Sequence, residues 1–431
     1  MPRNVANLPL SLIIRYAVIA IPLAFASLPL YIHLPDYYVR NLSIDLEIIG
    51  FLLLFIRLVD AIQDPIIGWL ADTYPQLRSN FILIGIFILS VGLGILYIGL
   101  NNLISINLQF ALGMLFSTTG LSLTMINLTT FGAVWHDNPH SRTKISAIRE
   151  GCGLIGLIIA GLTPAILASH FASNLTLRYH FLIYLSILIF TYYFYYPIQT
   201  YINSTHSKNN ERNDLRSLSK ILINYFQILK KQRYFFIICF LNYLSATLPA
   251  ILFVFFVKDY LQLEEYLGLF LTYYFLSGII MIPLWIFLGK KFNKINTWVG
   301  SLILSLVTFI WAFYVQMGDL IPFSIICCLT GLVLGADLAF PSAILGDKVV
   351  IDDDKDTGKY FAILTILPKV AIAIASGLSF IILSIVGFDA GKVNSLASLN
   401  TLKYLYALLP CVLRLIAIIM MMSLKKDNIN E

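Results

Sequence analysis

The sequence predicts an all-α integral membrane protein, and composition and the length of the apolar runs are the main observations behind that prediction. Of the 431 residues, 59% are hydrophobic and only 12% are charged, and the mean hydropathy is +0.84. A soluble domain carries about a quarter charged residues, so this chain has too few polar side chains to cover a surface in water. The apolar runs are continuous rather than alternating. This favours helices, because a helix satisfies its own backbone in hydrocarbon over about 20 residues.

The apolar runs number about twelve, and each is long enough for one membrane crossing. The breaks between them are alternately rich and poor in Lys and Arg. The positive-inside rule therefore predicts a multi-pass protein of the inner (plasma) membrane with both termini in the cytoplasm. The first run is longer than the apolar region of about 7–15 residues in a signal peptide, so we expect an uncleaved span. The predicted spans are residues 9–33, 46–70, 81–101, 105–132, 146–169, 179–200, 233–257, 266–289, 296–317, 321–346, 360–386 and 402–424.

The longest hydrophilic break divides the chain in the middle. It predicts an N-terminal six-helix bundle at residues 1–200, a cytoplasmic linker at 201–232 and a C-terminal six-helix bundle at 233–431. A weak internal repeat supports two halves, because Pro65 precedes Asp72 by seven residues in the second span and Pro283 precedes Lys290 by seven in the eighth. We therefore expect two pseudo-symmetric bundles.

Cysteine usage and net charge argue against other classes of protein. The cysteines lie in apolar runs without the spacing of metal ligands, so we expect neither a disulfide framework nor a transition-metal site. The net charge of +6 comes mainly from the loops and indicates membrane topology rather than nucleic-acid binding. The six histidines are scattered and no HExxH motif occurs, so an enzyme is not predicted and no cofactor is expected.

The stretch RLVDAIQDPIIGWLAD in the second span places ionisable side chains inside an apolar run. Arg57, Asp60 and Asp64 are spaced i, i+3 and i+7, and they share one helical face that Gly68 extends. Each charge at a helix centre costs about 2.5–3.5 kcal/mol on insertion scales, so this face should point into the bundle. Arg57 neutralises only one carboxylate. The excess negative charge and the hard oxygen ligands suit Na⁺, Li⁺ or a proton; a buried ion pair that only fixes packing is the alternative.

Other spans contain polar residues that could line the same cavity. Thr and Asn in a membrane helix often bond only to their own backbone, and charged residues near a span's end can reach the interface. Lys369 lies about two turns inside an apolar boundary and is expected to need an acidic partner. The candidates are Thr124 and Asn127 in span four, Arg149 and Glu150 in span five, Asp337 in span ten and Lys369 in span eleven.

The second-span motif resembles the helix-two signature of the glycoside–pentoside–hexuronide:cation symporters, the melibiose-carrier-like branch of the major facilitator superfamily. The resemblance covers nearly the whole chain and includes SRTKISAIREGCGLIG, GADLAFPSAILGD, the acidic loop KVVIDDDKDTGK and LPKVAIAIASG. It implies a major facilitator fold, in which twelve helices form two six-helix bundles around a central cavity.

The resemblance also implies roles for individual residues. Asp60, Asp64, Gln63 and Thr124 match the positions of that family's cation site, and Lys369 matches a lysine near it. Arg149 matches an arginine at the sugar pocket. Gly68 and Asp72 match the loop motif between helices two and three, with Arg78 as a basic partner.

The sequence departs from the sugar carriers of this family at three positions. Span one has no acidic residue, and Asn127 replaces the aspartate that binds sugar in helix four. These two differences make a galactoside held by paired carboxylates doubtful. Gln63 stands where the melibiose carriers have asparagine, which leaves the choice between Na⁺ and H⁺ open.

Together these observations predict a secondary active transporter that couples Na⁺ or H⁺ to the symport of a small polar solute, with a sugar or glycoside as the family's usual substrate. Arg57, Arg149 and Lys369 would also suit an organic anion, and a lysolipid-like amphiphile is a further alternative, as is a sensor or scaffold that no longer transports. The expected partners are the solute, the coupling cation and the lipid bilayer. A monomer would suffice, because such a carrier closes its own cavity.

Overall fold

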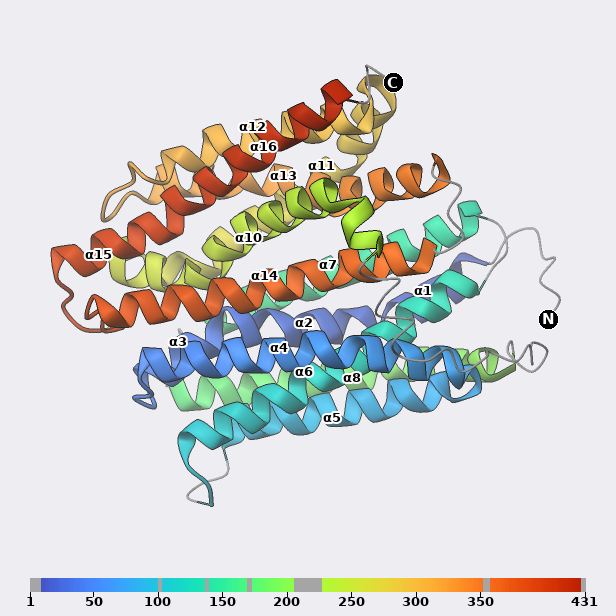
Figure 1. The fold of residues 1–431 in the computed structure, drawn as a ribbon. Helices are drawn as coiled ribbons and strands as arrows, with labels where there is room; N and C mark the ends of the chain where they lie inside the picture. Colours follow the sequence, from blue (N-terminus) through green and yellow to red (C-terminus); the bar gives the residue numbers. More distant parts are fainter. Residues whose placement is uncertain are drawn as a thin grey trace. The chain divides into compact units, whose positions relative to one another are not determined.

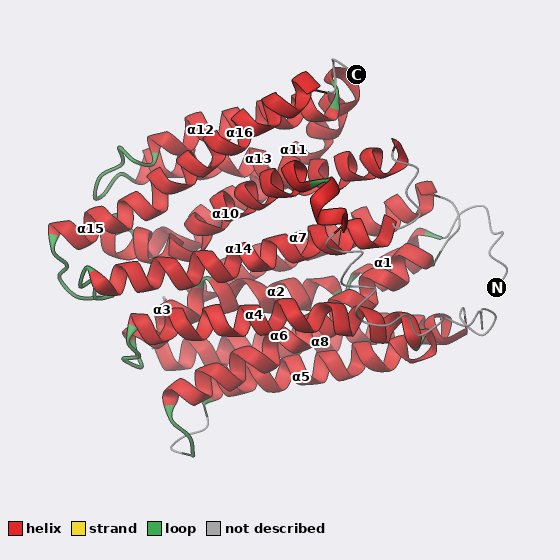
Figure 2. Ribbon diagram, viewed as in Figure 1, coloured by secondary structure: helices red, strands yellow, loops and turns green. Residues whose placement is uncertain are grey.

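A computed structural model describes residues 9–99, 103–135, 139–168, 173–204, 227–351 and 357–427. These parts of the chain are helical with short connections and contain no strand (Figure 2). The helices are α1 (Leu10–Ala17), α2 (Ala20–Tyr31), α3 (His33–Arg40), α4 (Leu46–Thr73), α5 (Arg78–Ile98), α6 (Ile106–Val134), α7 (Pro139–Ala168), α8 (Ser173–Ser204), α10 (Arg233–Phe255), α11 (Leu267–Phe292), α12 (Lys294–Trp311), α13 (Leu320–Ile351), α14 (Thr357–Ile385), α15 (Leu396–Lys403) and α16 (Leu409–Asp427).

Short irregular helices complete the described part of the chain. A π-helical turn, η2 (Phe256–Tyr260), continues α10, and a second one, η4 (Tyr404–Leu408), joins α15 to α16. The 3₁₀ turns are η1 (Pro75–Leu77) and η3 (Glu264–Tyr266).

The described helices have the lengths that a multi-pass membrane protein needs. Ten segments of the described residues are long and apolar enough to cross a membrane. Helices α4 and α7, of 28 and 30 residues, occupy the predicted second and fifth spans. The prediction of an all-α fold with about twelve spans is thus confirmed.

The chain divides into two compact units. One contains residues 1–34 and 59–214, and the other contains residues 35–58 and 215–431. This division differs from a simple split at the central break, because α3 from Pro35 onward and the first half of α4 group with the second unit. Residues 205–226 of the predicted linker lie outside the described residues, so its role stays a prediction.

In the first unit, α5 packs closely against α6 (Figure 1). Glycines on both helices allow the backbones to touch. A Cβ atom on Gly92 would lie 2.5 Å from Ser117 N, and one on Gly120 would overlap Leu89 N. Membrane helices commonly have small residues at such contacts. Lipid tails are as apolar as the helices, so helix association depends on close van der Waals packing of the backbones.

The second unit repeats several helix pairings of the first. Helix α2 packs on α7 in the first unit, and α10 packs on α14 in the second; likewise α5 contacts α8, and α12 contacts α16. These pairs occupy equivalent places in the order of spans in each half. The recurrence agrees with the two pseudo-symmetric bundles predicted from the weak sequence repeat.

We expect Gly120→Ala to lower the stability of the first unit by about 1–3 kcal/mol, because the new methyl group would meet backbone atoms of α5 that have no room to move. The measurement is thermal unfolding of the purified protein in detergent. Gly300→Ala in α12 is the matched control, since a Cβ there has nothing within 4 Å; it should be neutral or slightly stabilising. Equal effects of the two changes would contradict the role given to the α5–α6 contact.

Candidate functional site: an acidic face of α4

The second half of α4 meets polar side chains of α6 within the first unit. Asp60 is only 2% exposed, and its Oδ1 accepts a hydrogen bond from Ser122 Oγ at 2.9 Å. One turn along, Gln63 Oε1 accepts from Thr119 Oγ1 at 3.1 Å. A carboxylate, an amide oxygen and two hydroxyl groups therefore face one another, and these are the hard oxygen ligands that an alkali cation prefers.

The remaining α4 candidates continue along the helix on either side of Asp60. Asp64 lies one turn after Asp60 and is half-buried. Arg57 lies one turn before it, is 2% exposed and groups with the second unit. The protein itself buries both Arg57 and Asp60. The part of each residue in cation binding stays a prediction.

Thr124 lies on a different side of α6 from the contact with α4. It is buried, its Oγ1 donates to Gly120 O at 2.8 Å, and a Cβ atom on Gly85 of α5 would overlap that hydroxyl oxygen. The Thr124 hydroxyl thus donates its hydrogen bond to a carbonyl of its own helix, at the place where α6 packs against α5. Its role as a cation ligand stays a prediction.

Two hydroxyl residues that the sequence interpretation did not single out, Ser122 and Thr119, make the contacts to α4 instead. They are spaced i, i+3 in the segment STTGLSLT of span four, so they share a face of α6. That spacing was a signal in the sequence. It was not decisive, because Ser and Thr also occur in membrane helices only to bond their own backbone.

The other first-unit candidates lie on α6 and α7. Asn127 is buried and donates from Nδ2 to Leu123 O at 2.8 Å. Arg149 is largely buried and pairs with the exposed carboxylate of Glu150 at 2.5 Å. The Arg149–Glu150 pair therefore joins a buried cation to an exposed acid.

The predicted loop motif after α4 is described in part. Arg78 is buried at the start of α5 and its Nε donates to Ala71 O at 3.2 Å, which satisfies a carbonyl near the end of α4. A Cβ on Gly68 would have nothing within 4 Å. The side chain of Asp72 lies outside the described residues, so its pairing with Arg78 stays a prediction.

The two second-unit candidates lie on different helices. Lys369 lies on α14 and is half-buried. Asp337 lies on α13, and its carboxylate pairs with Arg414 of α16 in a buried polar cluster. Arg414 was not among the predicted site residues.

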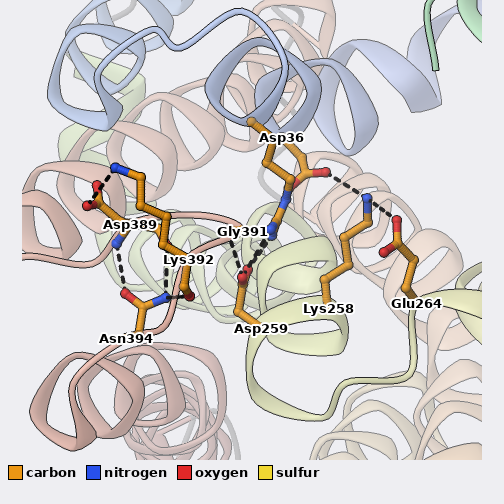
Figure 3. A network of polar contacts seen from close by, with 9 residues as sticks. Asp36, Lys258, Asp259, Glu264, Asp389, Gly391, Lys392 and Asn394 are labelled. Atoms are coloured by element: carbon orange, nitrogen blue, oxygen red, sulfur yellow. Dashed lines mark hydrogen bonds and ion pairs between the residues drawn. The ribbon is translucent and has the colours of Figure 1, made fainter.

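An ion-pair network in the second unit connects segments that are far apart in the sequence (Figure 3). Arg40 of α3 pairs through Nε with Asp36 and through both terminal nitrogens with Asp259 of η2. Lys258 Nζ lies 3.0 Å from Asp36 Oδ2 and 2.7 Å from Glu264 Oε1. We call these five residues the α3–η2 network; it lies on the side predicted to be outside the cell.

A glycine in the connection between α14 and α15 completes this network. Gly391 N donates to Asp259 Oδ1 at 3.0 Å. Its φ of +81° favours glycine, and a Cβ there would lie 3.0 Å from a terminal nitrogen of Arg40.

Burial alone would lower the pKa of Arg40, but the carboxylates of Asp36 and Asp259 raise it above its ordinary value. Arg40 therefore stays charged across the physiological range of pH.

The described residues contain no group of three or more His, Cys, Asp or Glu side chains that could hold a metal ion. The described cysteines are free thiols. The polar groups that the described contacts of these helices bring together include acids, amides, hydroxyls and arginines.

The fold and its long apolar helices define a multi-pass membrane protein. The chain belongs to the family described as MFS/sugar transport protein, whose model matches residues 15–428. The resemblance noted in the sequence is therefore confirmed at the level of the superfamily. A putative sulfoquinovose importer of Salmonella typhimurium is 22% identical over 421 residues, which cover 92% of this chain and 85% of that protein.

Solved structures of transporters share the fold at low identity. The nucleoside transporter NupG has a TM-score of 0.65 and 15% identity, covering 97% of this chain and 100% of that one. Tetrameric PepTSo2 has a TM-score of 0.68 and 12% identity, covering 96% and 98%. At such identities these likenesses establish the fold alone.

Proposed function

We propose that this protein is a secondary active transporter that couples Na⁺ or H⁺ to the symport of a small polar solute by alternating access. The observation that carries the proposal is Asp60, a buried acid on a membrane helix whose oxygen meets the Ser122 hydroxyl. A cation bound at this face would neutralise charge and lower the cost of enclosing the face in a closing cavity. Asp64 and Gln63 would contribute further oxygen ligands.

The membrane potential would then provide the driving force for uptake. One positive charge moved inward per cycle across about 100 mV supplies about 2.3 kcal/mol. Since about 1.4 kcal/mol is tenfold in an equilibrium constant, this supports roughly a fifty-fold solute gradient.

We propose that the α3–η2 network holds together the outer ends of the second-unit segments that it joins. Four of its five charged side chains are largely buried, and they join α3 to η2 and to the connection after α14. Separating such buried charge pairs is costly, so the network should keep these segments together.

The proposed solute is a sugar or glycoside. The family is described by sugar transport, and the relative from Salmonella typhimurium is named for sulfoquinovose import. An anionic sugar derivative is the second candidate, because Glu150, the carboxylate that pairs with the buried Arg149, is exposed and replaceable. We further propose residence in the inner membrane with both termini in the cytoplasm, in keeping with the distribution of Lys and Arg.

The experiment is a screen of neutral and anionic sugars in proteoliposomes, with Na⁺ and H⁺ gradients imposed separately. We expect accumulation of at least one sugar under one of the two gradients, and none in liposomes without protein. If neither gradient changes the rate or extent of efflux of preloaded sugar, the symport proposal is wrong. Failure of every solute to move, with correctly inserted protein, would favour a sensor or scaffold.

A further inference from the structure

A buried polar cluster in the second unit centres on Asp337 of α13. Its Oδ1 accepts hydrogen bonds from Asn242 Nδ2 of α10 at 3.0 Å and from Trp298 Nε1 of α12 at 3.1 Å. Its Oδ2 lies 3.5 Å from a terminal nitrogen of Arg414 on α16. Four helices that are candidate membrane spans therefore converge on one carboxylate.

This cluster is enclosed by protein. Trp298 is 0% exposed, Asn242 1% and Arg414 8%, while the side chain of Asp337 keeps 14% of its surface exposed. Packing alone does not require such a pair, because apolar residues of similar volume hold a bundle at least as well as a buried ion pair. Ionisable groups inside membrane helices more often serve ion or proton pathways.

The contact between the two charges is the longest in the cluster, and each charged group has further partners. Arg414 Nε donates to Ser245 Oγ at 3.1 Å, and a terminal nitrogen donates to Ser305 Oγ. Asp337 keeps the donors of Asn242 and Trp298. If the pair separates, both side chains retain neutral hydrogen bonds, so separation leaves neither group unsatisfied.

The amide of Asn242 has the chemistry to follow a change of protonation. Its Oδ1 is buried and has no hydrogen-bond partner among the described residues. An amide donates through nitrogen to a carboxylate and accepts through oxygen from a carboxylic acid. Rotation of this amide by half a turn would therefore direct its oxygen at a protonated Asp337.

We propose that Asp337 is a proton-binding site of the second unit. A proton from water adds to one carboxylate oxygen, Asp337 moves away from Arg414, and the new O–H donates to Asn242 Oδ1. No covalent bond other than O–H forms or breaks. A proton fits this enclosed cluster, whereas a metal cation would be repelled by Arg414 and a solute would need more room.

Several other titratable groups surround this carboxylate. Those within electrostatic reach of Asp337 include Arg414 of α16, Tyr274 of α11, and Tyr243 and Cys239 of α10. Arg414 is the one cation of this set, and its terminal nitrogen lies 3.5 Å from Asp337 Oδ2. The site is separate from the proposed cation site on α4, so its protonation does not depend on the proposed transport function.

The test is infrared difference spectroscopy of the full-length protein in lipid nanodiscs, between about pH 5 and about pH 9, without added Na⁺ or sugar. We expect a carbonyl stretch of a buried carboxylic acid at the low pH. Asp337→Asn should remove one component of the low-pH signal, and Asp60→Asn should keep that component. Low-pH difference spectra that are identical in the wild type and Asp337→Asn, or wild-type spectra with no carboxylic-acid band, would overturn the proposal.

Two further variants separate proton binding from a structural role. Arg414→Gln should make the band develop at least one pH unit higher, a tenfold gain in proton affinity, because the opposing cation is gone. Asn242→Ala should move the band to higher frequency, because the acid loses its acceptor. If Asp337→Asn does not fold, the double variant Asp337→Asn/Arg414→Gln, which leaves no buried charge uncompensated, replaces it. An unchanged band in all these variants would again reject the site.

Discussion

Gradient-driven uptake should be abolished by Asp60→Asn, while the protein still inserts into the membrane. The asparagine keeps the size of the side chain and can still accept from Ser122 Oγ, but it removes the charge that attracts the cation. Accumulation of the solute identified in the proteoliposome screen should fall from as much as roughly fifty-fold to equilibrium with the outside. The measurement is uptake of radiolabelled solute under an imposed Na⁺ or H⁺ gradient.

The matched control is Asp319→Asn, which removes a carboxylate from a connection in the second unit where it accepts from the backbone N–H of Gln316. Asparagine keeps that acceptor, so uptake should be unchanged. Counterflow, which needs no gradient, should persist in Asp60→Asn at a measurable rate. Full accumulation by Asp60→Asn would defeat the cation-site proposal.

Removing one partner of the α3–η2 network should release the segments that it joins. In Arg40→Gln, Asp259 loses both of its arginine contacts, and a buried charge left without its partner costs about 3–5 kcal/mol. Amide exchange in residues 256–266 and 386–395 should become faster by roughly a hundredfold to a few thousandfold, since Gly391 is bonded to Asp259. The measurement is hydrogen–deuterium exchange followed by mass spectrometry.

Lys392→Gln is the control for this prediction, because Lys392 pairs with Asp389 at 3.3 Å in the same connection but both side chains are well exposed. Such a surface pair contributes at most about 1 kcal/mol, so exchange should hardly change. The double variant Arg40→Gln/Asp259→Asn should lose less than the sum of the two single variants, as expected for residues in direct contact. Additive losses would show that the two residues act separately.

The sequence was sufficient to predict the acidic face of α4, because its charges are local in the chain and the helical period alone places them together. It did not reveal which hydroxyls of α6 oppose that face. The orientation of α6 about its own axis depends on the contact with α5 at Gly85 and Gly120. This contact uses the side of α6 that carries Thr124. Ser122 and Thr119 are left to meet α4.

The long-range charge pairs were not predictable from local patterns. Asp36 and Arg40 look like ordinary loop charges in the sequence, as do Lys258 and Glu264, and only the fold brings them together. Asp337 was expected in the cavity, yet its partner Arg414 lies 77 residues further on. An arginine within the apolar run CVLRLIAI was a signal of a buried partner, but the identity of that partner depends on the packing of α13 and α16.

The central claim is that the acids of α4 bind a cation from solution, and binding to the purified protein tests it without any knowledge of the solute. A ligand that binds only the folded protein raises the unfolding temperature in proportion to the logarithm of its concentration once binding is saturated. Titration with Na⁺ or Li⁺ against a choline background should stabilise the wild type and leave Asp60→Asn unaffected, whereas titration with protons should stabilise the wild type more than Asp60→Asn. Equal stabilisation of both proteins by every cation would contradict the claim.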